Sequence, residues 1–481
     1  MTDAPMTDPA EAAIADLTTR LRAAREAAAT DPFGDPVLLI ALAISRRMDD
    51  GSLDEVTVGR MLGRLATAAA TDRAGRIAAY VGLDRGEAAL PALAARIVRP
   101  DPQDSPVPFA AFRAAVERPR FAAVFTAHPT FSLPRSTAAA LARAACGEAL
   151  PEGLSHRPAA PTLEEEFEQA AEAIARGRDA ADALNRALLE AARGVWGDRW
   201  MGLTPRSVIL ASWVGYDTDG RTDIGWWDTL RLRLLMKRLG LARLAAQLEP
   251  LGECAQVLRG RVTAALEAVD AQLAVAPRRA DPPEVQSFAA QLVDRREAAL
   301  TDTAALIEQF ASALHTAPDD ATRMALAVAR AGLAAHGLSL AHTHVRLNAS
   351  QLHNALRQRL GIADAPDDMA RRRGLLATIN TALAEVEPQP VDLGALLAEQ
   401  ASAARLMMTV AQIAKHVDAS QPVRFLVAET ESGYTLLAAL WLARRFGVER
   451  HVEISPLFET AEALERGDRV VEEALRSPHF R

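Results

Sequence analysis

Cysteine, lysine and long apolar runs are all scarce in this sequence of 481 residues. Two cysteines, Cys146 and Cys254, are too few for a disulfide scaffold or a cysteine-based zinc site. Lysine occurs only as Lys237 and Lys415, so few lysines are available for catalysis. The longest apolar runs, such as 37–44, are far shorter than the about 20 residues of a bilayer span. The acidic N-terminus has no apolar stretch typical of a secretory signal, so we expect a cytoplasmic protein without a membrane partner.

Basic residues are fewer than acidic residues. The chain has 54 Lys+Arg against 62 Asp+Glu, a formal net charge of −8. This balance argues against a general nucleic-acid-binding protein, because binding to phosphates requires a basic face. The length is sufficient for a large core, divided among about three domains or one barrel with insertions.

Most of the sequence has helical spacing of its apolar residues. We predict capping boxes at Ser52 with Glu55 and at Thr162 with Glu165. The spacing predicts long helices over about 8–29, 163–193, 226–249, 284–316, 321–336, 368–385 and 391–418.

Five segments have a different pattern, that of short strands rich in apolar or β-branched residues. Each leads into a helical stretch and ends in polar residues, which is typical of a (β/α) barrel or a parallel sheet. In barrels, catalytic residues lie at the carboxyl ends of the strands. The segments are 121–130, 207–220, 338–347, 423–430 and 451–460.

The strand pattern predicts a mainly α fold with an α/β component. An eight-stranded barrel needs three more strands than the five found here. We therefore expect an incomplete (β/α)8 TIM-type barrel elaborated by many long helices, with the C-terminal barrel strands missing. The expected domains are a helical region over 1–120 and a partial barrel over 121–481, with helical insertions at about 150–200 and 226–336.

The first polar strand end is FTAHPT (125–130), where Pro129 fixes the turn and leaves the imidazole of His128 projecting. Histidine suits general base catalysis near neutral pH. Arg135, at the start of the next helix, is placed to contact an anion there. The alternative is a purely structural histidine.

The second is SWVGYDTDG (212–220), a glycine-bounded loop with Asp217 and Asp219. Gly220 is fourth from Asp217, which excludes a calcium EF-hand loop because that pattern needs glycine at its sixth position. The alternative interpretation is an Asp-capped turn over an aromatic core, since five of the six tryptophans lie between 196 and 227.

The third motif places His342, His344 and Arg346 on one face of a strand. Arg346 would act as a permanently charged clamp for an anion. The two histidines could bind zinc, although no third ligand is nearby in the sequence.

The fourth is ISPLFET (454–460), in which Glu459 ends an apolar strand. A carboxylate there suits magnesium, and the alternative is stabilisation by the dipole of the following helix. A histidine base, an arginine clamp and a metal carboxylate at strand ends together indicate an anionic, metal-bound substrate such as a phosphate ester.

These four motifs, in this order, resemble those of phosphoenolpyruvate carboxylases, and the resemblance runs through about 120–480. It implies a reaction of phosphoenolpyruvate with bicarbonate to give oxaloacetate and phosphate. It implies that His128 takes the proton of a carboxyphosphate intermediate and that Arg346 neutralises oxyanion charge. Glu459 matches one of two carboxylates that hold Mg²⁺ or Mn²⁺.

The resemblance also implies a role in substrate binding for the second loop. Asp217, Asp219 and Gly220 match a loop near the substrate phosphate, and Arg135 belongs to the first motif. Members of this family form homo-oligomers, usually tetramers, so we expect one here.

Several positions depart from the family pattern, and the family continues well beyond the PLFET helix. The missing half carries the second metal carboxylate, so we expect this chain alone to be inactive, or active only with a partner chain that supplies the rest. The alternatives are a non-catalytic scaffold or regulatory protein of the same fold, and a zinc hydrolase that uses His342 and His344. The departures are Phe131, Tyr216, Thr218, Arg221, His344 and Asn348.

Overall fold

The computed structural model describes residues 8–31, 33–82, 86–125, 133–151, 153–154, 161–219, 221, 223–366, 368 and 370–480. Two compact units divide the chain. The first combines residues 1–86 with 131–160, and the second combines 87–130 with 161–481. The helical region predicted over 1–120 is therefore shared between the two units.

The first unit is helical in its described part. Aspartate side chains cap α1 and α3, because Asp8 accepts a hydrogen bond from Ala10 N and Asp54 accepts one from Thr57 N. The capping box predicted at Ser52 is therefore wrong, and Asp54 takes that role. The helices are α1 (Pro9–Ala28), α2 (Pro36–Asp49), α3 (Glu55–Val81) and α6 (Arg135–Ala145).

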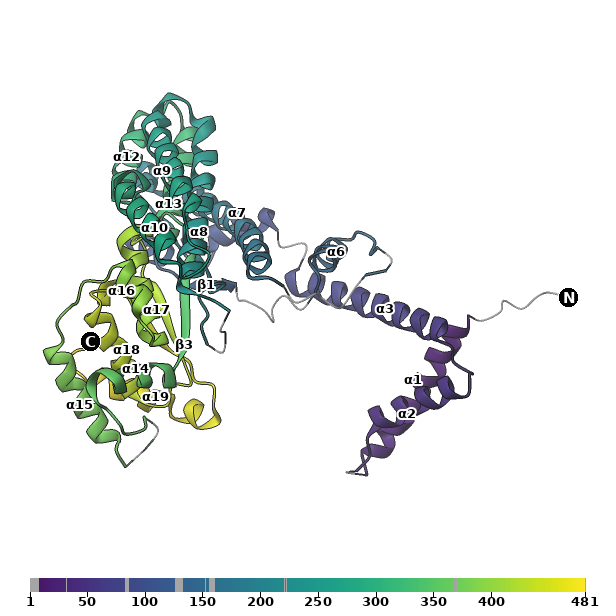
Figure 1. Cartoon of the computed structure of the whole chain (residues 1–481). Helices are drawn as coiled ribbons and strands as arrows, with labels where there is room; N and C mark the ends of the chain where they lie inside the picture. Colours follow the sequence, from purple (N-terminus) through teal and green to yellow (C-terminus); the bar gives the residue numbers. More distant parts are fainter. Residues whose placement is uncertain are drawn as a thin grey trace. The chain divides into compact units, whose positions relative to one another are not determined.

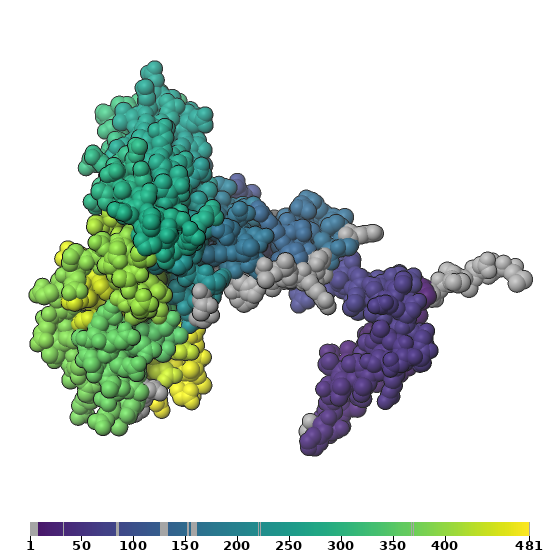
Figure 2. All heavy atoms as spheres, viewed as in Figure 1, coloured from purple at the N-terminus to yellow at the C-terminus, as the bar shows by residue number. Residues whose placement is uncertain are grey.

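Helix α2 buries none of its residues in this unit. It packs through the partly buried side chains of Ile40, Ala43 and Ile44 against a small core of Ala10, Ala13, Leu17, Leu53 and Met61. Helices α1 to α3 belong to the purple segment in Figure 2.

The second unit contains a five-stranded parallel sheet in the order β1-β2-β3-β4-β5. All five strand segments predicted from the sequence are confirmed, although each strand is shorter than its segment. Parallel pairing brings the carboxyl ends of the strands to one edge of the sheet. The strands are β1 (Phe121–Phe125), β2 (Val208–Ser212), β3 (His342–Asn348), β4 (Val423–Ala428) and β5 (Val452–Pro456).

Helices surround this sheet and form a separate bundle beside it, drawn in teal in Figure 1. The capping box of Thr162 and Glu165 begins the long helix α7, as predicted. The helices of this unit include α4 (Leu90–Val98), α5 (Phe109–Val116), α7 (Leu163–Trp196), α8 (Trp226–Leu248), α9 (Gln256–Ala274), α13 (Asp320–His336), α14 (Ala349–Leu360), α15 (Arg372–Glu385), α18 (Gly433–Arg445) and α19 (Ala461–Leu475).

Two predicted long helices are interrupted. The segment 284–316 forms α10 (Pro282–Asp294), α11 (Arg296–Ala299) and α12 (Ala304–Thr316), with Leu300 at φ 61° between the last two. The segment 391–418 forms α16 (Leu393–Ala398), α17 (Ser402–Gln412) and the π-helix η6 (Ile413–Val417). Helical periodicity alone does not detect such breaks, because the apolar spacing continues through them.

The mainly α fold with a parallel α/β component is thus confirmed. In the described part of the chain, no helix is long and apolar enough to cross a membrane.

Helix α8 is anchored to the loops around the sheet by buried cations. Arg233 forms an ion pair with Asp418 at 3.3 Å, and both side chains are almost inaccessible. Lys237 Nζ donates hydrogen bonds of 2.6 Å to the carbonyl oxygens of Leu300 and Val417. Burial lowers the pKa of Lys237 from 10.5 to about 7, partly offset by the charge of Asp418.

We predict that Lys237 makes the stability of the protein depend on pH. Between pH 7 and 10.5 the unfolded chain holds this proton and the folded chain releases it. The free energy of unfolding should therefore rise with pH in this window, by at most about 1.4 kcal/mol per pH unit. Urea unfolding of wild type and Lys237→Met between pH 7 and 9 measures this slope.

The matched control is Lys415→Met, which removes the other lysine from an exposed position. We expect Lys415→Met to keep the pH slope of the wild type and Lys237→Met to lose it. Equal slopes in all three proteins would show that Lys237 titrates normally.

Candidate active site

The site begins with the turn that follows β2. Tyr216 N and Asp217 N both donate hydrogen bonds to Trp213 O, which closes a tight turn. Gly215 has φ 81°, and a Cβ there would lie 2.2 Å from Leu232 Cδ1. Glycine is therefore required for the chain to make this turn against α8.

After the turn, the chain pairs with the end of β3. Asp217 and Arg346 form a parallel bridge, and Thr218 N donates to Arg346 O at 3.0 Å. Arg346 N donates in turn to Tyr216 O at 3.2 Å. The loop with the two aspartates is thus held against the strand that carries the arginine.

The guanidinium of Arg346 joins two carboxylates from distant parts of the chain. Its Nη2 lies 2.9 Å from Asp219 Oδ2 and 3.2 Å from Glu459 Oε1. Its Cζ lies 5.7 Å from the centroid of the Trp213 ring. Among the described residues, the buried Nε of Arg346 has no hydrogen-bond partner.

Neighbouring groups hold Asp219 in place. Asn348 Nδ2 donates to Asp219 Oδ1 at 3.1 Å, and Asp219 N donates to Asp217 Oδ1 at 3.1 Å. Burial raises the pKa of Asp217, although the hydrogen bond from Asp219 N and the charge of Arg346 oppose this. Asn348 also caps α14 through a capping box with Gln351.

Glu459 is fixed by a second contact as well. Its Oε2 accepts a hydrogen bond of 3.1 Å from Glu429 N, at the end of β4. The Glu429 backbone has φ 55°, a left-handed conformation. Thr460, the next residue, caps α19. The carboxylate of Glu459 therefore links the ends of β3, β4 and β5.

The structure brings together three of the residues predicted for the site, Arg346, Asp219 and Glu459, with Asp217 adjacent. His128 and Gly220 lie outside the described residues. Arg135 begins α6 in the first unit, and the roles proposed for these three residues stay predictions.

Zinc at the histidines of β3 is not supported by their contacts. His342 Nε2 lies 2.6 Å from Ala335 O. Burial lowers the pKa of His344 to about 4, which leaves its ring neutral near pH 7, so it is the lack of further ligands that disfavours zinc. The described residues contain no group of three or more His, Cys, Asp or Glu side chains that could hold a metal ion.

The lack of such a group among the described residues also argues against a site for Mg²⁺ or Mn²⁺ built from these side chains alone. The carboxylate of Glu459 is already shared between Arg346 and Glu429 N, and the other carboxylate on Arg346 belongs to Asp219. A guanidinium between two carboxylates competes with a divalent cation for the same oxygens. The described side chains by themselves do not fit such a metal.

The structural contacts of Asn348 and Arg221, two residues that depart from the family pattern, were not predicted from the sequence. Asn348 positions Asp219 and caps α14. Arg221 forms ion pairs with Glu166, which is buried in α7, and with Asp223. The three glutamates at 164–166 indicate in the sequence that an arginine could pair with this segment. That the partner is Arg221 depends on the tertiary fold, which places the segment beside this loop.

Comparison with known proteins gives one family. Residues 244–481 match the family model described as phosphoenolpyruvate carboxylase. The matched region includes Arg346 and Glu459, and it does not include Asp217 or Asp219. No curated protein matches the chain.

We predict that Asn348 has two separable roles. Asn348→Ala should lower the free energy of unfolding by about 1 kcal/mol, because the cap of α14 is lost. Asn348→Asp should keep the cap but place a second carboxylate next to Asp219. The two carboxylates should repel each other and loosen the ion pair between Asp219 and Arg346.

Urea unfolding measures the first effect, and the NMR resonances of the Arg346 guanidinium report the second. Asp392→Ala, which removes the cap of the remote helix α16, is the control for cap loss without any effect on Asp219. Unchanged Arg346 side-chain resonances in Asn348→Asp would contradict the second role.

Proposed function

We propose that this chain, whose residues 244–481 belong to the phosphoenolpyruvate carboxylase family, acts in the carboxylation of phosphoenolpyruvate by bicarbonate. The products are oxaloacetate and phosphate. The observation that supports this proposal is the cluster of Arg346, Asp219 and Glu459 at the carboxyl ends of parallel strands. In the (β/α) barrel that we propose this sheet to be part of, that edge is where catalysis occurs.

Arg346 is proposed to bind and stabilise anions during the reaction. Bicarbonate attacks the phosphorus of phosphoenolpyruvate, which gives carboxyphosphate and the enolate of pyruvate. Carboxyphosphate then breaks down to CO₂ and phosphate, and the enolate carbon attacks CO₂. Each step develops or moves negative charge on oxygen, which a fixed guanidinium stabilises. The permanent charge of Arg346 suits this task.

The remaining site residues are assigned by resemblance. We propose that His128 takes the proton of carboxyphosphate and that Asp217, Asp219, Gly220 and Arg135 contribute to substrate binding. The partners would be phosphoenolpyruvate and bicarbonate, with further copies of this chain or a second chain.

The family generally depends on a divalent metal. Since the described side chains do not by themselves fit Mg²⁺ or Mn²⁺, no step is assigned to the metal here. We propose that the chain alone binds the substrate anion without completing the carboxylation, and that further metal donors come from outside the described residues.

A non-catalytic scaffold or regulatory protein is the second candidate. It is favoured by the departures at Asn348 and Arg221, because both residues make structural contacts in this chain. The two candidates differ in substrate binding, because a scaffold has no need to bind phosphoenolpyruvate.

We predict that the chain binds phosphoenolpyruvate and that Arg346→Ala weakens this binding about tenfold or more, because a charge-assisted hydrogen bond is worth about 1.5–3 kcal/mol. Isothermal titration calorimetry measures both affinities. Arg346→Lys should recover part of the loss, since it keeps the charge without the planar donor geometry.

The matched control is Arg476→Gln, which removes an exposed arginine that directly follows α19 and is paired with Glu472. Its affinity should equal that of the wild type. If the wild type does not bind phosphoenolpyruvate, the scaffold interpretation is correct. If Arg346→Ala binds as tightly as the wild type, Arg346 is not the anion clamp.

A second prediction concerns His128. In an assembly that forms oxaloacetate, His128→Ala should release phosphate from phosphoenolpyruvate without forming oxaloacetate, because the proton of carboxyphosphate is no longer removed. Parallel assays of phosphate and oxaloacetate measure this ratio. His315→Ala, at an exposed position of α12, is the control, and full carboxylation by His128→Ala would remove His128 from its role.

A further inference from the structure

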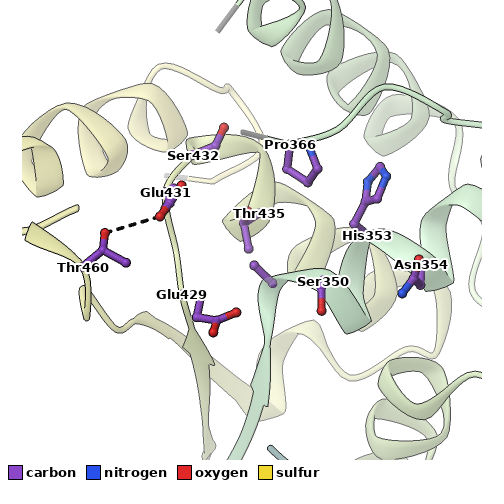
Figure 3. Close-up of a pocket in the computed structure, with 10 residues that line it drawn as sticks. Ser350, His353, Asn354, Pro366, Glu429, Glu431, Ser432, Thr435 and Thr460 are labelled. Atoms are coloured by element: carbon purple, nitrogen blue, oxygen red, sulfur yellow. Dashed lines mark hydrogen bonds between the residues drawn. The ribbon is translucent and has the colours of Figure 1, made fainter. Parts of the chain in front are cut away.

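A pocket of about 410 Å³ lies beside the candidate active site in the second unit. It lies beyond the end of β4, between α14 and α18, as Figure 3 shows. Its polar lining includes the side chains of Ser350, His353, Glu429, Glu431, Thr435 and Thr460. Ala349 and Pro366 add apolar surface. The volume is in the range of small-molecule sites, which is about 300–1,000 Å³.

The charge of this pocket is negative. Glu429 and Glu431 are both exposed at its wall, and neither forms an ion pair with another described residue. The Glu431 carboxylate accepts one hydrogen bond, from Thr460 Oγ1 at 3.3 Å (Figure 3). Arg372 donates to the backbone oxygen of Glu431, but it lies 2.9 Å from the carboxylate of Glu473. A positively charged ligand in the pocket would therefore contact two carboxylates that no basic side chain of the described residues neutralises.

A buried hydroxyl provides an independent indication of a ligand. Thr435 is only 2% exposed and lines the pocket. Among the hydrogen bonds of the described residues, none involves this hydroxyl, whereas the neighbouring Ser432 hydroxyl accepts one from Tyr434 N. The Thr435 oxygen is not one of the enclosed polar atoms that lack a partner, so it can still be reached from the pocket and can hydrogen-bond to a ligand there.

From these observations we infer that the pocket binds a small organic ammonium ion. Ammonium N–H groups can donate to the two carboxylates and to the Thr435 hydroxyl, and the methylenes of the ligand can pack on Ala349 and Pro366. A bare divalent ion is less suited, because it needs about six oxygen ligands and the described residues form no metal-binding group of three. This inference concerns binding alone and does not depend on the proposed carboxylase function.

The pocket is also connected to the active-site carboxylate. Glu429 contributes its side chain to the pocket and its N–H to Glu459 Oε2. Thr460 lines the pocket and directly follows Glu459. An ammonium ligand would therefore bind at the outer side of the segment that positions Glu459.

Isothermal titration calorimetry of the full chain with 1,4-diaminobutane tests the inference. We expect measurable binding that weakens at high salt, as for an electrostatic site. Glu429→Gln and Glu431→Gln should each weaken binding about five- to tenfold, and Thr435→Val should weaken it with little change in volume.

Glu465→Gln is the matched control, because it makes the same charge change at an exposed position of α19 away from the pocket. It should bind the diamine like the wild type, and circular dichroism should show that all variants are folded. Absence of binding to the wild type, equal affinity in all variants, or binding of MgCl₂ but not of the diamine would each overturn the inference.

Discussion

The ion pairs of one guanidinium organise the edge of the sheet on which the rest of the site depends. Arg346 contacts Asp219 and Glu459, which are 127 and 113 residues away in the sequence. These contacts are possible because β2, β3, β4 and β5 are parallel, so their carboxyl ends meet at one edge. The turn at Gly215 and the left-handed backbone of Glu429 bring the two carboxylates to this arginine.

A second set of cations supports this edge from inside the fold. Arg233 and Lys237 of α8 bind Asp418 and two backbone carbonyls without access to solvent. Arg178 of α7 donates to the carbonyl of Leu340 at 2.9 Å, and burial lowers its pKa to about 10. Such contacts satisfy backbone groups in the connections between helices and strands. They fix the helical layer against the sheet and therefore fix where the strands end.

The charge balance around Arg346 has consequences for function. With two carboxylates on one guanidinium, the site is acidic until a ligand or a further cation enters. The nearby pocket with Glu429 and Glu431 extends this acidic character along the ends of β4 and β5. Under the proposed function, an anionic substrate would compete with Asp219 and Glu459 for Arg346.

The strand segments, most of the helices and the position of Arg346 and Glu459 near strand ends could be predicted from the sequence. Local patterns are sufficient for these predictions, because apolar periodicity and polar strand ends depend only on residues that are close in the sequence. The sequence did not reveal the breaks at Leu300 and at 399–401, because helical spacing continues across them. That Asp219 and Glu459 share one arginine, and that Asn348 holds Asp219, could be seen only in the folded chain. The reason is that these contacts join residues more than a hundred positions apart, and only strand order and register bring such residues together.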